Sequence, residues 1–370
     1  MDSPQRAERI LGFDGLRAIA VTLVFLDHFV LNGRALGRLG VDQFFVLSGV
    51  LIVGILHRRR ASIESGESSF RAELAGFWSL RARRLLPLYY AVLGLFAIAT
   101  WAHHRPLPLD LPWYLAFVGN IYLGYVSQVW GPLCHLWTLS VEQQFYVLAS
   151  IALLLAPRRR HLFLVSILLI CALELFTLDA FNWVRARMSY VSSVQSFGYM
   201  AAGGLLALRP GLLAFDSRVK LGLVVAALVG LLGANFAPRG ALADVTLTVI
   251  DVACCYIVCV GTVDLVRGSP TSLGVRLLEW PPLRYFGRIS YGFYILHFLS
   301  PHFPTIAGAT APLPRALLLI AQFAATLAAS ALSWEFFEKR FQPGQRRAAA
   351  RPHPAPPAHS RVPDAYPSRL

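Results

Sequence analysis

The chain has 370 residues, of which 56% are hydrophobic and only 15% are charged. Soluble domains carry about a quarter charged residues, so this composition excludes an ordinary soluble enzyme and indicates a polytopic membrane protein. The net charge of +14 comes from short basic clusters between apolar runs. That pattern favours anchoring at the face of a lipid bilayer over binding of nucleic acid.

Apolar runs of nearly 20 residues predict an all-α bundle of about ten membrane helices. The expected spans are 10–32, 40–57, 84–103, 140–156, 161–179, 191–208, 219–236, 242–266, 286–306 and 314–337. Of the 34 basic residues, 26 fall on the side of this arrangement that holds the N-terminus, which the positive-inside rule assigns to the cytoplasm. We therefore expect a multi-pass protein of the cytoplasmic membrane with both termini in the cytoplasm.

Two segments depart from this pattern of spans. Residues 112–130 are apolar but rich in aromatic and polar side chains, and we expect an interfacial or re-entrant segment there. The tail 341–370 is rich in proline, alanine and arginine and lacks apolar periodicity, which predicts disorder in the cytoplasm. A single integral membrane domain, 1–340, is then expected to hold any active site.

The first predicted span carries two polar side chains at depth, Arg17 and His28. An arginine at the centre of a span costs roughly +2.5 to +3.5 kcal/mol, so such residues usually face a protein interior or a wet cavity. Eleven residues rise about 16 Å in about three turns, which predicts that both side chains point to one side. The alternatives are a snorkelling Arg17 paired with Asp14 and an interfacial His28, instead of a general base.

The next candidates lie on the second and third spans. Asp42 stands at the expected outer start of the second span, where it either caps the helix or orients His28. Arg81 and Arg84 are one turn apart, a spacing that suits phosphate groups, although anchoring at the inner leaflet is the simpler explanation. Ser48 lacks the strand–turn–helix context of a nucleophile elbow and is interpreted as helix packing.

Polar residues also mark the fourth and ninth spans. Glu142 opens the fourth span and either complements the helix dipole or faces the same outer cavity as His28. In the ninth span, Ser290, Tyr294 and His297 share one helical stripe. A second histidine at this depth favours an outward polar cavity.

Two glutamates, Glu335 and Glu338, are assigned to the cytoplasmic boundary of the last span. The sequence has no Gly-rich phosphate loop, no HExxH, no CxxC and no GxSxG motif. No metal is therefore expected in the chemistry of this protein.

Five segments, taken together and in this order, resemble the acyltransferase family 3 of integral membrane proteins. They are DGLRAIAVTLVFLDH (Asp14–His28), GVDQFFVLSG (Gly40–Gly49), RARRLLPLYY (Arg81–Tyr90), HLWTLSVEQQFY (His135–Tyr146) and GRISYGFYILH (Gly287–His297). That family includes bacterial O-acyltransferases of surface polysaccharides and enzymes that acylate macrolides. The resemblance implies an acyl-CoA donor, such as acetyl-CoA, that enters from the cytoplasm. It also implies a hydroxyl acceptor on a carbohydrate or a glycosylated small molecule.

The resemblance also implies roles for individual residues. It makes His28 the catalytic base and Arg17 its partner in the family's arginine–histidine signature. It assigns Arg81 and Arg84 to the phosphates of coenzyme A, and Glu142 to the acceptor or catalytic site. Asp42, Tyr294 and His297 complete the candidate site as expected contacts of the acceptor.

A transporter or flippase is the main alternative function, because intramembrane arginine, histidine and aspartate also serve proton coupling. Transport would be favoured by inverted internal repeats with paired broken helices, and the sequence has no convincing repeat. A non-catalytic sensor or scaffold is a third possibility, and it predicts that replacing His28 changes no activity. The oligomeric state stays open.

Overall fold

The computed structural model describes residues 9–31, 35–127, 129–155, 160–181, 191–209, 215–236, 241–298 and 312–342. Within these ranges all regular secondary structure is helical, which confirms the predicted all-α class. The predicted tail lies almost entirely outside the described residues, which end at 342.

Long helices account for most of the described chain, and each predicted span overlaps one of them. They are α1 (Phe13–Leu26), α2 (Ala35–Glu64), α3 (Phe70–Ala102), α6 (Trp137–Leu155), α7 (Arg160–Phe181), α9 (Ser193–Leu208), α10 (Ser217–Phe236), α11 (Ala241–Gly268), α13 (Pro281–Leu296) and α14 (Pro312–Phe336). The shorter elements are η1 (Asp27–Leu31), α4 (Leu111–Leu115), α5 (Gly119–Ile121), η2 (Tyr122–Ser127), η3 (Cys134–Leu136), α12 (Leu273–Leu278) and η6 (Glu338–Phe341).

Among the described residues, four helical stretches are long and apolar enough to cross a membrane. They are Gly37–Glu64, Phe70–Ala102, Cys134–Leu155 and Ala316–Phe341. The chain is therefore a multi-pass membrane protein, and the expected number of ten spans stays a prediction. The segment 112–130 is broken into the short helices α4, α5 and η2 instead of one span.

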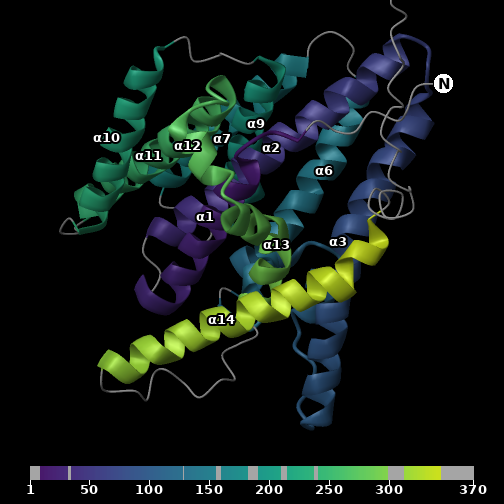
Figure 1. Cartoon of the computed structure of the whole chain (residues 1–370), viewed down its shortest axis with the longest axis vertical. Helices are drawn as coiled ribbons and strands as arrows, with labels where there is room; N and C mark the ends of the chain where they lie inside the picture. The colour runs from purple at the N-terminus through teal and green to yellow at the C-terminus, as the bar shows by residue number, and fades with distance from the viewer. Residues whose placement is uncertain are drawn as a thin grey trace, which may run out of the picture.

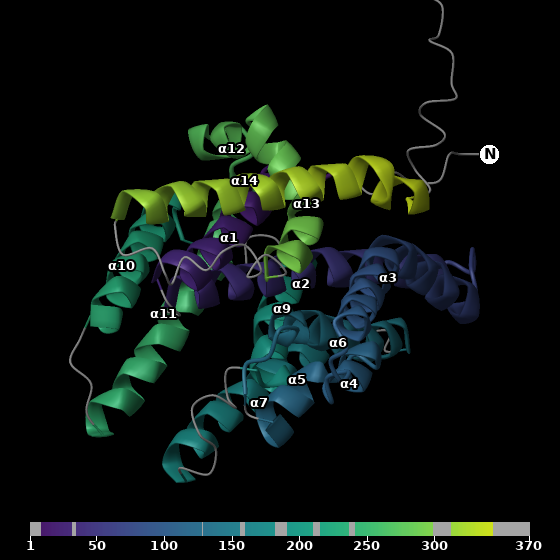
Figure 2. The same cartoon turned by 90° about the horizontal axis from the view of Figure 1, so that it is seen from below.

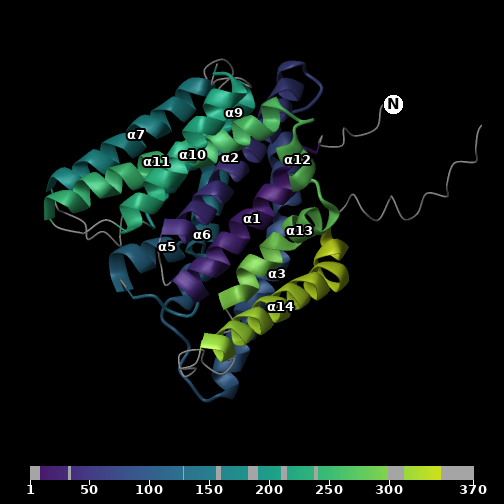
Figure 3. The ribbon, with the colours of Figure 1, turned by 60° about the vertical axis from the view of Figure 1, so that its left-hand side comes forward.

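Helix α2 is the central packing element, with α1, α6, α9 and α11 against it. Its contact with α9 is close because both helices offer glycine: a Cβ on Gly49 would collide with the Met200 carbonyl, and one on Gly203 with the Val46 carbonyl. Figure 3 shows α1 between α2 and α13, with α14 along one edge and α7, α10 and α11 on the opposite side. Figures 1 and 2 show the same α14 lying across one face of the bundle.

Two local features of α1 determine where its polar side chains lie. A Cβ on Gly287 would collide with the Asp14 carbonyl, so the glycine lets α13 approach the start of α1 closely. At its other end α1 passes directly into the π-helix η1, which contains His28. Single π turns widen a helix and occur frequently at functional sites.

Candidate active site

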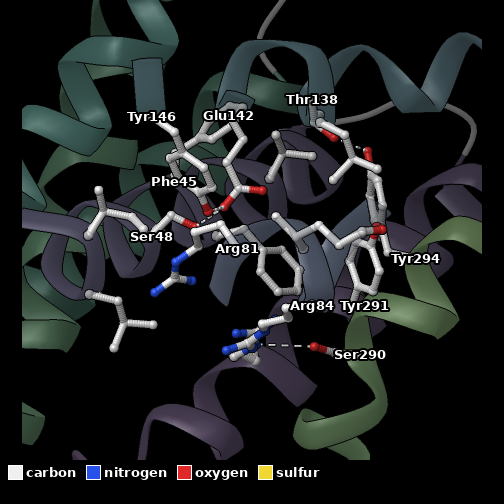
Figure 4. A pocket seen from close by; sticks show the side chains of 17 residues that line it. Phe45, Ser48, Arg81, Arg84, Thr138, Glu142, Tyr146, Ser290, Tyr291 and Tyr294 are labelled. Carbon is white, nitrogen blue, oxygen red and sulfur yellow. Dashed lines mark hydrogen bonds between the residues drawn. The ribbon is translucent and has the colours of Figure 1, made fainter. Parts of the chain in front are cut away.

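A cavity of about 70 Å³ lies where α1, α2, α3, α6 and α13 meet. Its charged lining consists of Arg17, Arg81, Arg84 and Glu142, and we call it the arginine cavity. Figure 4 shows Arg81 near Ser48 and Glu142, and Arg84 nearer to Ser290. Four predicted site residues from three helices, α1, α3 and α6, thus share one cavity.

Glu142 is held at the wall of this cavity by two hydroxyl groups. Ser48 Oγ donates a 2.6 Å hydrogen bond to Glu142 Oε1, and the Tyr146 hydroxyl donates to the same oxygen. Glu142 also interacts electrostatically with Arg17 and Arg81. The structure therefore puts Glu142 among the arginines and not beside His28, the position that one sequence-based alternative assigned to it.

Ser48 is a functional candidate that the sequence reasoning interpreted only as packing. Glu142 and Tyr146 are four residues apart and therefore lie on one polar face of α6. This spacing was the only sign in the sequence that a polar residue of another helix would pack against that face. The sequence offered no way to know that α2 would present Ser48 to that face. The serine and the glutamate are 94 residues apart in the chain.

The arginines of the cavity are held by neutral and aromatic groups. Arg17 Nε donates a 3.2 Å hydrogen bond to Ser290 Oγ on α13, and its guanidinium carbon lies 5.8 Å from the centre of the Phe44 ring. The guanidinium carbon of Arg81 lies 5.8 Å from the centre of the Tyr146 ring. These are cation–π distances, which reduce the cost of holding a cation away from water.

A second, more polar cavity of about 220 Å³ adjoins the arginine cavity, because Arg84 and Tyr291 line both. Its other lining residues include Arg288, Trp334 and Glu338. The Glu338 side chain is buried, accepts a 2.9 Å hydrogen bond from Ser333 and interacts electrostatically with Arg84. The assignment of Glu338 to the cytoplasmic boundary stays a prediction, and the structure adds that Glu338 is a neighbour of a cavity arginine.

Tyr294 separates the arginine cavity from a group of histidines. Its hydroxyl donates a 2.7 Å hydrogen bond to the His135 carbonyl and accepts a 2.8 Å hydrogen bond from Thr138 Oγ1. Thr138 and Tyr294 both line the cavity, as Figure 4 shows. On the other side, the Tyr294 carbonyl lies 2.5 Å from His297 Nδ1. Tyr294 is therefore in direct contact with both polar regions.

Three imidazole rings form the histidine cluster, which consists of His28, His135 and His297. His28 Nδ1 lies 3.0 Å from His297 Nε2, and the two rings are nearly parallel with centres 5.2 Å apart. The His135 ring meets the His297 ring at 81° with centres 5.4 Å apart. His28 is exposed, whereas His297 and His135 are buried. Within the described residues, the cluster does not form a metal-ligating group.

Asp42 lies apart from both regions. Helix α2 begins at Ala35, so Asp42 sits two turns inside the helix and cannot cap it. Its carboxylate pairs with Arg38 at 3.7 Å and interacts with Tyr199 and Cys255. Asp42 does not line the arginine cavity, and its described contacts do not include His28. The capping role expected from the sequence is therefore wrong, because the helix starts earlier than the apolar run indicated.

Comparison with known proteins gives two informative relatives. A peptidoglycan O-acetyltransferase of Listeria monocytogenes, OatA, is 26% identical over 365 residues, covering 88% of this chain and 54% of the relative. A Bacillus subtilis protein, YrhL, provisionally named a peptidoglycan O-acetyltransferase, is 28% identical over 332 residues, covering 80% of this chain and 49% of the relative. The chain thus spans about half the length of these relatives.

No solved structure matches the chain. The family profile described as "Acyltransferase domain" matches residues 10–335, which include the arginine cavity and the histidine cluster. This match extends over nearly the whole described chain, and the named relatives agree with it. The chain therefore belongs to acyltransferase family 3.

Proposed function

We propose that this protein is an O-acetyltransferase of the cytoplasmic membrane that moves an acetyl group from acetyl-CoA to a carbohydrate hydroxyl. The observation that carries the proposal is the contact of Tyr294 with both the arginine cavity and the histidine cluster. The arginines that would hold the donor lie on one side of Tyr294, and the candidate base, His28, belongs to the cluster on the other side. The names of the relatives support acetyl as the acyl group and peptidoglycan as one candidate acceptor.

The donor enters from the cytoplasmic side in this proposal. Coenzyme A carries several negative charges, and guanidinium groups bind phosphate through paired hydrogen bonds. Arg84 lines both cavities, so a phosphate in the 220 Å³ cavity and the pantetheine arm of the donor in the smaller one are both within its reach. Arg288 adds a second cation to the larger cavity, and Arg81 adds one to the smaller.

His28 is the proposed general base. The acceptor hydroxyl gives its proton to the imidazole while its oxygen attacks the thioester carbonyl, forming the new C–O bond. The C–S bond then breaks, and the proton passes from His28 to the departing thiolate. His28 suits this role because the residue is exposed and its Nδ1 lies 3.0 Å from His297 Nε2.

Arg17 and Glu142 support the donor site in this scheme instead of touching the reacting atoms. Eleven residues of α-helix rise about 16 Å, so the guanidinium is well separated from the proposed base. Its hydrogen bond to Ser290 joins α1 to α13. Glu142 balances the charge of the arginines and joins α6 to α2 through Ser48.

The deciding experiment measures thiol release from labelled acetyl-CoA by purified protein in nanodiscs, with peptidoglycan fragments and other glycans as acceptors. We expect acceptor-dependent release and labelled product, both abolished by His28→Ala. Labelled product from His28→Ala at the wild-type rate would overturn the assignment of the base. Transport of an intact glycan into vesicles, without thiol release, would favour a transporter instead.

A further inference from the structure

His297 carries its proton on a defined ring nitrogen. Its Nδ1 lies 2.5 Å from the Tyr294 carbonyl oxygen, and a carbonyl oxygen only accepts hydrogen bonds, so Nδ1 bears the hydrogen. The ring is 1% exposed, and an imidazolium at such a site would lose its hydration. A neutral imidazole has one N–H group, so His297 Nε2 holds a lone pair.

That lone pair determines the proton position on His28. His28 Nδ1 lies 3.0 Å from His297 Nε2, and two lone pairs at this distance would repel each other. His28 Nδ1 therefore carries the hydrogen and donates it to His297, which leaves the lone pair of a neutral His28 on Nε2. We propose that His297 is a positioning residue that fixes this tautomer, so that Nε2 of His28 is the atom that accepts the proton. The inference rests on the proposed function, in which His28 is the base.

The packing of the cluster supports a positioning role for His297. The two rings are within 6° of parallel, and the Phe298 ring packs against His28 at 77° with centres 5.3 Å apart. His28 is exposed whereas His297 is buried, so the acceptor meets the first ring and not the second. This differs from the expectation that His297 itself contacts the acceptor.

His135 is oriented differently. Its Nε2 lies 3.1 Å from the Ile295 carbonyl and therefore carries its hydrogen there. It meets His297 nearly at right angles, ring against ring, with no hydrogen bond between them among the described contacts. The hydrogen-bonded pair of His28 and His297 is thus the unit that couples a buried imidazole to the exposed base.

The hydrogen bond between His28 and His297 has a role in each step of the proposed transfer. When His28 Nε2 takes the hydroxyl proton of the acceptor, the ring becomes an imidazolium whose Nδ1–H still donates to His297. The lone pair of His297 stabilises that transient charge and keeps the ring from turning. The proton leaves from the same Nε2 atom to the sulfur of the departing coenzyme A, which returns His28 to its starting tautomer.

The test compares three substitutions in nanodiscs with acetyl-CoA and a glycan acceptor. His297→Phe keeps a ring of similar size and removes the acceptor nitrogen, so we expect kcat to fall about 10- to 100-fold with the donor KM unchanged. His297→Gln keeps an acceptor oxygen and should restore most of the loss. The control is Arg83→Ala, since Arg83 is exposed and lines neither cavity, and this variant should stay within a few-fold of wild type.

A spectroscopic measurement tests the tautomer without relying on activity. In protein labelled with ¹⁵N-histidine, the signals lost in His28→Ala identify His28, and their shifts separate a protonated nitrogen from an unprotonated one. We expect a protonated Nδ1 and an unprotonated Nε2 in the wild type, and a mixture of tautomers in His297→Phe. An inactive His28→Ala together with a fully active His297→Phe, or a wild-type His28 protonated at Nε2, would overturn the positioning role alone. A fully active His28→Ala would instead overturn the proposed base.

Discussion

Ser48 on α2 donates a 2.6 Å hydrogen bond to Glu142 on α6, and this contact fixes the carboxylate at the wall of the arginine cavity. Tyr146 donates to the same oxygen from one helical turn away. Two hydroxyl donors on one oxygen leave the rest of the carboxylate facing Arg17 and Arg81. The pair thus links helix packing to the charge balance of the site.

Replacing Glu142 with glutamine tests that charge balance. The amide retains an oxygen for Ser48 and Tyr146 but removes the negative charge near the arginines. We expect the free energy of unfolding to fall by about 1–3 kcal/mol, less than for a fully buried pair because Glu142 is only half-buried. The measurement is the thermal unfolding midpoint in detergent. The matched control is Glu335→Gln, which breaks an exposed pair with Lys339 and should cost at most about 1 kcal/mol. Equal shifts in the two variants would contradict the charge role.

The donor site can be tested with neighbouring arginines of α3. Arg81 and Arg84 line the arginine cavity, whereas Arg83 is exposed and does not. We expect Arg81→Ala and Arg84→Ala to raise the KM for acetyl-CoA about tenfold or more, because each removes charge-assisted hydrogen bonds worth about 1.5–3 kcal/mol. Arg83→Ala should leave this KM unchanged. Titration with coenzyme A gives an independent affinity, and equal effects at all three positions would point to surface charge instead of a site.

The hydroxyl of Tyr294 should couple energetically to Thr138. Tyr294→Phe removes both hydrogen bonds of the hydroxyl, and Thr138→Val removes one of the same pair. Each change should destabilise the protein by about 1–2 kcal/mol. The double variant should cost less than the sum, because the two side chains share one contact. Thermal unfolding of the wild type, the two single variants and the double variant completes this double-mutant cycle. If the two losses of stability simply add, the contact contributes no coupling energy.

The close contact of α2 with α9 predicts a large difference between two glycines. A Cβ on Gly49 would collide with the Met200 carbonyl, which is backbone and cannot swing away. Gly49→Ala should therefore destabilise by about 1–3 kcal/mol or prevent folding. Gly94 in α3 has open space around it, and Gly94→Ala should stabilise by up to about 1 kcal/mol through helix propensity. Expression level and unfolding midpoint measure both, and a Gly49→Ala protein as stable as wild type would contradict the close contact.

The sequence predicted the helices well because each membrane helix is a local pattern of apolar residues. It also singled out Arg17, Arg81, Arg84 and Glu142, since charge inside an apolar run is costly and visible without a structure. Their meeting in one cavity depends on how five helices pack, and that information is spread over the chain. Residues with no local signal, such as Ser48, were therefore interpreted as packing.

Errors at helix ends have a different cause. The start of α2 includes residues before the apolar run, so Asp42 lies inside the helix although the run begins at Gly40. The assignment of Glu338 to a boundary, made because it follows the last apolar run, stays a prediction, but its burial was not foreseen. The buried position of its side chain comes from η6, α3 and α13 folding together, which periodicity along one helix does not encode.

Tyr294 serves the two polar regions with different parts of itself: the hydroxyl faces the arginine cavity, and the main-chain carbonyl holds His297. Mutagenesis can reach only the first of these, because every amino acid at this position keeps the carbonyl. A series of side-chain replacements at Tyr294 would therefore alter the cavity wall and the bond of the hydroxyl to the His135 carbonyl, while the contact of the Tyr294 carbonyl with His297 stays chemically intact.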